Sequence, residues 1–349
     1  MEKLLEVNNL SVSFRTHSGM VRAVRDVSFY VNSRETIAIV GESGSGKSVT
    51  VKTIMGILAK NAVIDEGEVL YDEQDILKLT EKGYHTIRGK RIGLIFQDPL
   101  SALNPIMTIG KQICEVLTIG RGMSKADAKV RALELMRDVG ITEPEVRFKQ
   151  YPFQFSGGMR QRIVIAIALA NEPEILICDE PTTALDVTVQ SKILELINEI
   201  KEKRHMAVVF ITHDLGVVAN IAERVYVMYA GRIVESGTCN DIFFDPRHPY
   251  TWALLSSCQD QSTKGRLLAI PGTPPNMEKP PVGDAFAARN PYAMKIDFEQ
   301  EPPTFKISET HFAATWLLHP NAPKVEMPDV LRERIDRMLK EEEEFNARN

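Results

Sequence analysis

The sequence predicts an α/β protein: a core of mainly parallel strands with flanking helices, joined to an antiparallel β subdomain, a helical subdomain and a C-terminal extension. The core is indicated by short continuous apolar runs, such as residues 36–40, that end in glycine or polar residues and alternate with helical stretches. Apolar and polar residues alternate between Leu4 and Val31, which indicates the antiparallel strands. The extension is indicated by proline, which becomes frequent after residue 260.

The elements of the core follow from their local patterns. The run 36–40 leads through glycines into a helical stretch at 49–55, so a strand, a loop and a helix are expected there. Further buried strands are expected at 92–96, 175–178 and 207–211. Because helical stretches lie between these runs, we expect a mainly parallel sheet that is covered on both faces.

The remaining chain divides into a helical part and a tail. Helical spacing of Met and Leu is clearest over 98–154, and we place a helical subdomain at about residues 98–170. The first domain is expected to span residues 1–259 and the extension residues 260–349. An amphipathic helix is expected at 328–345, with five apolar side chains pointing inward: Val330, Leu331, Ile335, Met338 and Leu339.

Composition excludes several classes of protein. With 349 residues, 44% of them hydrophobic, the chain can bury a sizeable core. A net charge of -5 argues against a nucleic-acid partner. No apolar run approaches the ~20 residues that span a bilayer, and the first residues do not resemble a signal peptide. Four scattered cysteines (Cys114, Cys178, Cys239 and Cys258) suggest free thiols in a reducing compartment, so we expect a soluble cytoplasmic protein.

A glycine-rich segment follows the strand 36–40: Gly41-Glu42-Ser43-Gly44-Ser45-Gly46-Lys47-Ser48. Glycines allow backbone N–H groups to close around phosphate oxygens at a helix N-terminus. Lys47 is expected to reach the β- and γ-phosphates, and the Ser48 hydroxyl to bind Mg²⁺. The flanking strand and helix argue against a glycine-rich turn with an incidental lysine. The segment therefore predicts a P-loop NTPase core, with nucleotide contacts from these eight residues and Val49.

Two carboxylates end the buried strand 175–178. Asp179 and Glu180 stand where a carboxylate is costly unless it has a task. We expect Asp179 to bind in the Mg²⁺ shell and Glu180 to polarise the attacking water as general base. The alternative is a helix cap, because Pro181-Thr182-Thr183 follows.

A second candidate anion site lies at Ser156-Gly157-Gly158. A hydroxyl and bare N–H groups at a helix N-terminus favour an anion. One chain hardly needs two γ-phosphate sites, so we expect this turn to contact the ATP of a partner subunit.

In this order, the three motifs resemble the ATP-binding cassette family over roughly Leu4 to Gly237. The resemblance implies that two chains clamp ATP between the phosphate loop of one and the Ser-Gly-Gly turn of the other. Ala184-Leu185-Asp186 matches the family's loop at the dimer interface, for which an ordinary turn is the alternative. Met159 departs from the family pattern, which usually has glutamine there.

Three single residues receive roles from this resemblance. Gln97 follows the strand 92–96, where its amide can complete a metal or water shell and couple nucleotide state to a membrane partner. His213 is the switch histidine that contacts the γ-phosphate. Phe14 is the candidate for stacking on adenine. The alternatives are a surface glutamine, a structural histidine and a core phenylalanine.

Three further segments resemble the ATPases of oligopeptide and dipeptide importers: Asp98 to Pro105, His248-Pro249-Tyr250-Thr251 and Pro271-Gly272-Thr273-Pro274-Pro275. The resemblance implies a peripheral ATPase on the cytoplasmic face of the membrane, which powers peptide uptake through ATP-driven dimerisation. It implies a homologous ATPase as partner in a heterodimer, two membrane permeases and an extracellular binding protein. A nickel importer of the same subfamily remains open.

Non-transport classes fit less well. DNA-repair ATPases with the same motifs insert a coiled coil or zinc module, whereas here only about sixty residues separate Gln97 from Ser156, without heptads or CxxC. A non-hydrolytic scaffold is disfavoured because Lys47 and Glu180 are both present.

The extension departs from its relatives at four positions. Relatives often hold an iron–sulfur cluster there through four cysteines, but this chain has Asp284, Asn290, Asp297 and Thr315. Oxygen ligands would not hold such a cluster, so none is expected. We expect a metal-free docking module between two cassettes; a hard-cation site at Asp284 and Asp297 is the alternative. Its expected core is aromatic: Phe286, Tyr292, Phe305, Phe312 and Trp316.

Overall fold

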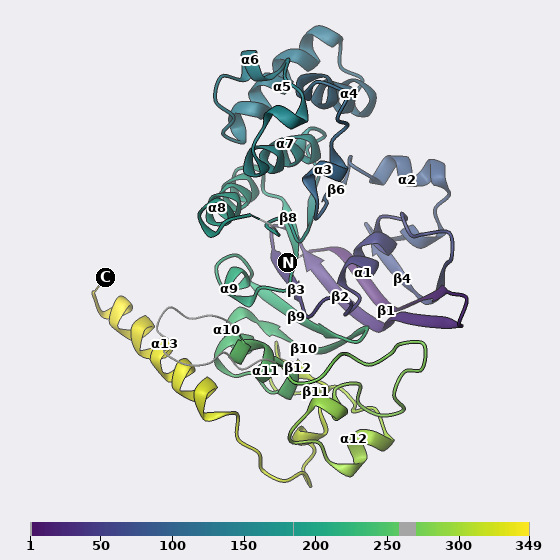
Figure 1. Cartoon of the computed structure of the whole chain (residues 1–349), viewed down its shortest axis with the longest axis vertical. Coiled ribbons are helices and arrows are strands. Elements are labelled where there is room, and N and C mark those ends of the chain that lie inside the picture. Colours follow the sequence, from purple (N-terminus) through teal and green to yellow (C-terminus); the bar gives the residue numbers. More distant parts are fainter. Residues whose placement is uncertain (1, 184, 258–269, 349) are drawn as a thin grey trace.

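A twisted sheet with strand order β11-β12-β10-β9-β3-β8-β7-β6 runs through the centre of the protein (Figure 1). The computed structural model describes residues 2–183, 185–257 and 270–348, with side chains of the last helix only as far as residue 340. Ala184, Cys258 and the expected domain boundary at 259/260 lie outside the described residues. The strands are β3 (Thr36–Val40), β6 (Ile92–Ile95), β7 (Ile175–Asp179), β8 (Ala207–Thr212), β9 (Arg224–Tyr229), β10 (Arg232–Thr238), β11 (Phe305–Lys306) and β12 (Phe312–Ala313).

The five strands from β9 to β6 are parallel, which confirms the predicted mainly parallel core. Both faces of these strands are buried. Alternate residues such as Ile177 and Val209 face the helix α1 (Lys47–Ile54) and the antiparallel sheet. Their neighbours Leu176 and Val208 face the helices on the other side. This double burial explains why the strands appear in the sequence as continuous apolar runs.

The antiparallel subdomain is a separate sheet of order β2-β1-β4-β5. Its strands are β1 (Lys3–Arg15), β2 (Met20–Asn32), β4 (Ala62–Tyr71) and β5 (Gln74–Asp75). One face buries Leu5, Val7 and Leu10 against α1, whereas the opposite face carries polar residues. The predicted period-2 alternation is therefore the pattern of a sheet with one solvated face.

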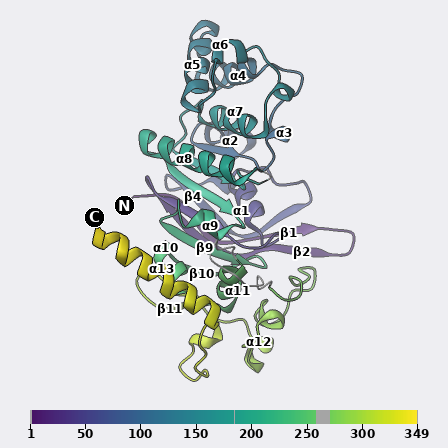
Figure 2. The same cartoon turned by 60° about the vertical axis from the view of Figure 1, so that its left-hand side comes forward.

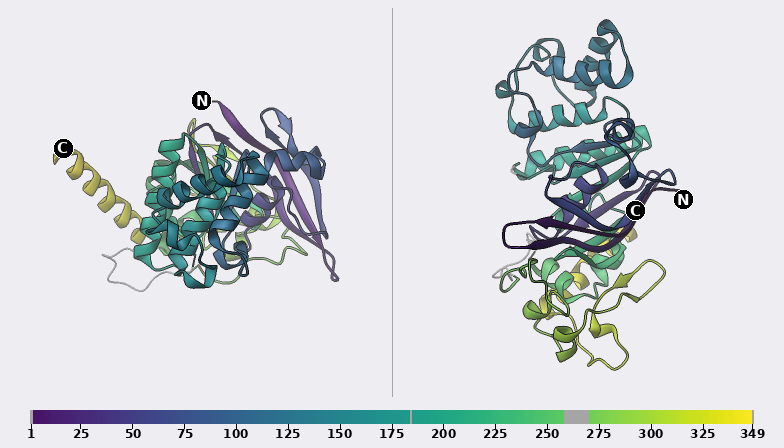
Figure 3. Two further views of the ribbon diagram at one scale, coloured as in Figure 1. Left: turned by 90° about the horizontal axis from the view of Figure 1, so that it is seen from above. Right: turned by 90° about the vertical axis from the view of Figure 1, so that its right-hand side faces the viewer.

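The helical subdomain forms one end of the molecule and the extension the other, with both sheets between them (Figure 3). The elements of the helical subdomain are α3 (Pro99–Ala102), α4 (Ile109–Arg121), α5 (Lys125–Asp138), α6 (Pro144–Arg147), η2 (Pro152–Gln154) and α7 (Gly157–Leu169). Their apolar side chains share one core with the long helix α8 (Val187–Arg204) and with strands β6 to β8. Two elements before it, η1 (Ile76–Lys78) and α2 (Glu81–Ile87), connect β5 to β6.

The C-terminal part is built onto the central sheet. Its elements are α9 (Leu215–Val218), α10 (Cys239–Phe244), α11 (Pro249–Ser257), η3 (Ala287–Arg289), α12 (Lys295–Glu299), η4 (Trp316–Leu318) and α13 (Asp329–Arg348). Strand β12 pairs with β10, so the extension adds two short strands to the sheet edge. The expectation that five aromatic residues form the core of the extension was only partly right. Phe286 is buried, but against Tyr229 and Tyr250 of the cassette, and the other four aromatic residues are partly buried.

The last helix, α13, lies on the outside of the molecule (Figure 2). Only some of the side chains that were expected to point inward from this helix are buried. Leu331 and Ile335 are buried, whereas Val330 is 50% exposed and Leu339 is 40% exposed. The helix meets the cassette along the narrow i, i+4 stripe of the two buried residues, which is too narrow to cover their neighbours.

The four oxygen-bearing residues of the extension are buried and cap local turns. Asp284, Asn290 and Thr315 each accept the N–H of the residue two positions later, at 3.0, 3.0 and 3.3 Å. Asp297 accepts the N–H of Met294 at 2.6 Å. Burial raises the pKa of Asp284 to about 6. Within the part of the chain that the structure describes, no group of three His, Cys, Asp or Glu side chains could hold a metal ion.

Among the described residues, no helix has the length and apolar character that crossing a membrane requires.

Candidate active site

The phosphate loop connects β3 to α1, and two of its glycines are required by close packing. A Cβ atom on Gly41 would lie 2.0 Å from the carbonyl oxygen of Met228 in β9. Gly46 has φ 105°, and a Cβ there would lie 2.6 Å from the carbonyl oxygen of Ala23. The loop is therefore held tightly against the sheet, and only glycine fits at these two positions.

Lys47 is buried although it carries a charge. Its ammonium donates to the carbonyl oxygens of Gly41 at 2.8 Å and Glu42 at 3.0 Å. Burial lowers the pKa of Lys47, an effect that the nearby carboxylates of Glu180, Asp179 and Glu42 oppose. A cation held at the centre of a loop of N–H groups is suited to bind phosphate oxygens.

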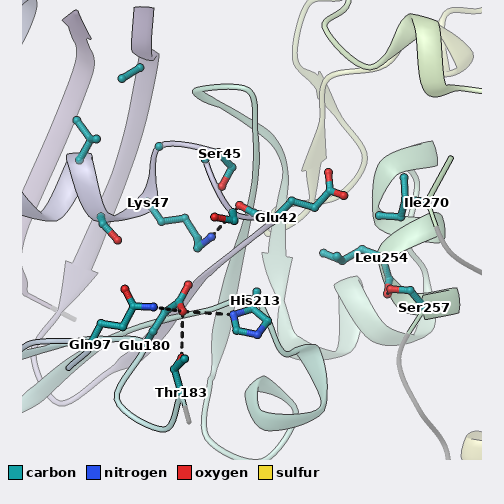
Figure 4. A pocket seen from close by; sticks show the side chains of 16 residues that line it. Glu42, Ser45, Lys47, Gln97, Glu180, Thr183, His213, Leu254, Ser257 and Ile270 are labelled. Atoms are coloured by element: carbon teal, nitrogen blue, oxygen red, sulfur yellow. Dashed lines mark hydrogen bonds and ion pairs between the residues drawn. The ribbon is translucent and has the colours of Figure 1, made fainter. Parts of the chain in front are cut away.

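A cavity of about 750 Å³ opens over the loop (Figure 4). Its lining joins the phosphate loop, the ends of three strands and part of the C-terminal region. The lining residues are Ala23, Glu42, Ser43, Gly44, Ser45, Gly46, Lys47, Ser48, Val49, Gln97, Glu180, Thr183, His213, Leu254, Ser257 and Ile270.

Glu180 lies where three side chains converge in this cavity. Its Oε2 accepts from Gln97 Nε2 at 3.0 Å and from Thr183 Oγ1 at 3.0 Å, and it lies 3.4 Å from His213 Nδ1 (Figure 4). Its backbone has φ 48°, a left-handed conformation that is costly for a residue with a side chain. The turn after β7 thus aims this carboxylate into the cavity at the cost of backbone strain.

Asp179, at the end of β7, bonds the loop directly. Its Oδ1 accepts from Ser48 Oγ at 2.8 Å. Burial raises the pKa of Asp179, and the Ser48 hydrogen bond opposes this shift. A hydroxyl and a carboxylate in contact supply the hard oxygen ligands that Mg²⁺ prefers.

The cavity has features that a triphosphate would satisfy. Ser45 Oγ is buried and has no hydrogen-bond partner among the described residues. A Cβ built on Gly44 would meet no atom of the described residues within 4 Å, so that part of the loop is open on the side of this Cβ. Buried polar atoms normally have partners, so an orphaned hydroxyl in a loop of this shape fits a polar ligand such as phosphate.

The Ser-Gly-Gly turn lies apart from this cavity. Ser156 is the N-cap of α7 and its Oγ accepts from Met159 N–H at 3.4 Å, while neither it nor the two glycines line the cavity. A Cβ on Gly158 would lie 2.6 Å from Val189 of α8. The fold therefore does not bring the Ser-Gly-Gly turn and the phosphate loop of one chain together in this cavity.

Phe14 is also not part of the cavity lining. It lies on β1, where it pairs with Val21 of β2 and Ala62 of β4, and it is partly buried. Stacking of this ring on adenine stays a prediction.

Several residues near the site had no signal in the sequence that revealed their place. Thr183, Leu254 and Ile270 line the cavity, and Tyr250 Oη accepts the N–H of Glu42 at 2.8 Å. Tyr250 belongs to a segment noticed only for its resemblance to importer ATPases. Arg289 binds the Glu42 carboxylate from the extension, across 247 positions of sequence.

Solved structures have the same fold over about two thirds of this chain. Two structures of the cassette MJ0796, one of them a dimeric post-hydrolysis state with ADP and Pi, match with TM-scores of 0.61 at 30% and 31% identity. Each match covers 67% of this chain and 98% of the other. The profile of the ABC transporter family matches residues 24–183. Fold and site together define an ATP-hydrolysing enzyme of the ATP-binding cassette class.

Sequence relatives show to which family within the ATP-binding cassette class the chain belongs. The profile described as the oligopeptide/dipeptide transporter C-terminal region matches residues 234–296. The oligopeptide transport ATP-binding protein OppD of Bacillus subtilis is 56% identical over 96% of this chain and 95% of its own. The dipeptide transport ATP-binding protein DppD of Lactococcus lactis is 60% identical over 94% of this chain and 95% of its own. The chain belongs to the family of oligopeptide and dipeptide transport ATP-binding proteins.

Proposed function

We propose that this protein hydrolyses ATP to power the uptake of oligopeptides or dipeptides through two membrane permeases, as a peripheral subunit at the cytoplasmic face of the cell membrane. One observation carries the proposal: Glu180, held by Gln97, Thr183 and His213 over the phosphate loop, in a chain that matches peptide-transport ATPases over nearly its full length. The proposed peptide cargo is inferred from the names of those relatives, which are oligopeptide and dipeptide transport ATP-binding proteins.

The proposed chemistry assigns one task to each group. Lys47 and the loop N–H groups would bind the β- and γ-phosphates, and Ser48, Asp179 and Gln97 would hold Mg²⁺. When bound, Mg²⁺ neutralises charge on the phosphate oxygens. Glu180 would accept a proton from the attacking water, and His213, whose Nδ1 lies 3.4 Å from the Glu180 carboxylate, would contact the γ-phosphate.

The separation of the Ser-Gly-Gly turn from the cavity supports a composite site. Ser156, Gly157 and Gly158 would close over the nucleotide of a homologous ATPase subunit, and that subunit would close over this one. A heterodimer with such a subunit, docked on the permeases and fed by an extracellular peptide-binding protein, is the complete proposed assembly.

Transport itself can be measured on the purified assembly. We expect the tagged chain to co-purify from detergent-solubilised membranes with a second cassette and two permeases. These subunits can be reconstituted in proteoliposomes with the cassettes facing the lumen and with the binding protein and labelled di- or oligopeptide outside. Labelled peptide should accumulate in the lumen only when the lumen contains ATP. Accumulation of Ni²⁺ without peptide would replace the peptide cargo with nickel, and the absence of any permease would contradict the transport role.

The permease is expected to dock on the helical subdomain next to Gln97. Apolar side chains are exposed there: Leu100 is 56%, Phe153 70% and Ile106 83% exposed. Gln97 connects this region to the site through its 3.0 Å bond to Glu180. We therefore expect single cysteines at Leu100 or Ile106 to cross-link to the permease in a manner that depends on ATP. A cysteine at Val282, exposed to 80% but in the extension, is the matched control. Cross-links from position 282 alone would contradict this docking surface.

A further inference from the structure

Glu42, the second residue of the phosphate loop, is bonded through each of its polar groups. Its N–H donates to Tyr250 Oη of α11 at 2.8 Å, and its carbonyl oxygen accepts from Lys47 Nζ at 3.0 Å. Its carboxylate receives two bonds from Arg289, Nη1 to Oε2 at 2.6 Å and Nη2 to Oε1 at 3.0 Å. The loop is thus connected at one residue to both its own lysine and the C-terminal region.

Arg289 is held as firmly as the carboxylate that it binds. Its side chain is 5% exposed, and that of Glu42 is 27% exposed. Arg289 Nε donates to the carbonyl oxygen of Pro271 at 2.7 Å, and Nη1 also donates to Tyr229 Oη at 3.1 Å. A guanidinium with these partners has one orientation, and its planar fork fixes the orientation of the carboxylate.

The charge of Glu42 presents a problem that Arg289 solves. Glu42 lines the cavity, and Figure 4 shows its side chain directed away from Lys47, towards the side of Leu254 and Ile270. The same cavity contains Glu180, so an unpaired Glu42 would add negative charge where phosphates bind. Like charges that share a cavity repel each other, and the repulsion grows as they approach and as water is excluded.

We infer that Arg289 is a positioning residue of the nucleotide site: it neutralises Glu42 and holds its carboxylate away from the phosphates, so that the C-terminal extension sets the affinity of the loop for nucleotide. The inference rests on the proposed phosphate contacts of the loop and is independent of the cargo. It gives the extension a task in ATP binding in addition to any docking role.

The test is a double-mutant cycle on the full-length chain, measured as equilibrium binding of ATP, ADP and AMP in EDTA so that no hydrolysis occurs. We expect Arg289→Ala to weaken ATP binding roughly 10-fold, ADP less and AMP least, because repulsion grows with the phosphate charge. Glu42→Gln in the same chain should restore ATP affinity, since it removes the charge that Arg289 neutralises. Arg289→Lys, which keeps the charge but not the fork, should lie between wild type and Arg289→Ala, and it carries the test if Arg289→Ala does not fold.

A matched pair lies at the other end of β3. Arg224 binds Glu35 through Nε and Nη2 at 2.9 and 2.7 Å, with side chains 11% and 7% exposed, and neither residue lines the cavity. Arg224→Ala should lower the melting temperature, and it should not change the affinity for one of the three nucleotides more than for another. Unchanged affinities in Arg289→Ala, or equal losses that Glu42→Gln does not reverse, would overturn the inference. Failure of the wild-type chain to bind ATP would instead refute the proposed phosphate contacts.

Discussion

Replacing Glu180 with Gln is expected to reduce ATP turnover by roughly 100-fold or more while leaving ATP binding intact, because general bases contribute on that scale. The amide keeps the size of the carboxylate and can still accept from Gln97 and Thr183, so the bonds seen at 3.0 Å have equivalents. It cannot accept a proton from water at neutral pH. The loss should therefore appear in kcat, with the nucleotide Kd changed by no more than about threefold.

The other end of β7 provides the control for Glu180. Glu174 directly precedes the strand and accepts from Tyr71 Oη at 2.6 Å, far from the cavity lining. Glu174→Gln should keep turnover close to that of the wild type. Single-turnover measurements at saturating ATP separate the chemical step from binding. Near-normal turnover by Glu180→Gln would show that Glu180 is not the base.

The second large effect is expected at Gly157, which does not line the cavity over the phosphate loop of its own chain. Gly157→Asp should reduce turnover by roughly 100-fold, the scale on which single charge-stabilising groups act in catalytic sites. Among the described residues, an added Cβ meets only Leu185, at 3.6 Å, and an acidic residue in the first turn of α7 favours the helix, so the fold should persist. The carboxylate would instead repel the phosphates presented by the partner subunit.

Binding and hydrolysis should separate in this variant. Because Gly157 does not line the cavity, the isolated Gly157→Asp chain should bind ATP with wild-type affinity. Wild-type turnover should rise with protein concentration, or on addition of the second cassette. Lys125→Asp places an aspartate at the equivalent position of α5, the first residue after its serine N-cap, although it also removes a positive charge, and it should leave turnover unchanged. A monomer with full, concentration-independent activity would contradict the composite site.

Local patterns were sufficient to predict the loop from Gly41 to Ser48 and the strand end at Asp179 and Glu180, whereas Gln97 and His213 were singled out by the resemblance to ATP-binding cassettes. All of these residues come after continuous apolar strands. Parallel strands place their carboxyl ends at one edge, so residues that follow them converge whatever their distance in sequence.

The C-terminal wall could not be predicted in the same way. Strands β11 and β12 have two residues each, which is too short for the alternation of apolar and polar residues to be recognised in the sequence. The pairing of Arg289 with Glu42 depends on how the whole extension packs against Tyr229 and Tyr250, and neither residue is unusual in its local sequence. Val330 and Leu339 were misplaced for a related reason: the apolar period of a helix gives a face, but not the width of the surface that it meets.

The position of β3 at the centre of the sheet has a consequence for how the protein is made. Its five side chains are all buried, and its neighbours β8 and β9 are encoded far downstream; the pair Glu35–Arg224 alone spans 189 positions. During synthesis the strand and the phosphate loop therefore leave the ribosome long before anything can pair with them. Non-local contacts of this kind make folding slow, and apolar strands that are still unpaired are prone to aggregation until folding is complete. Pairing on both sides of β3 requires the chain as far as Tyr229, and the bonds of the loop residue Glu42 to Tyr250 and Arg289 require still later residues.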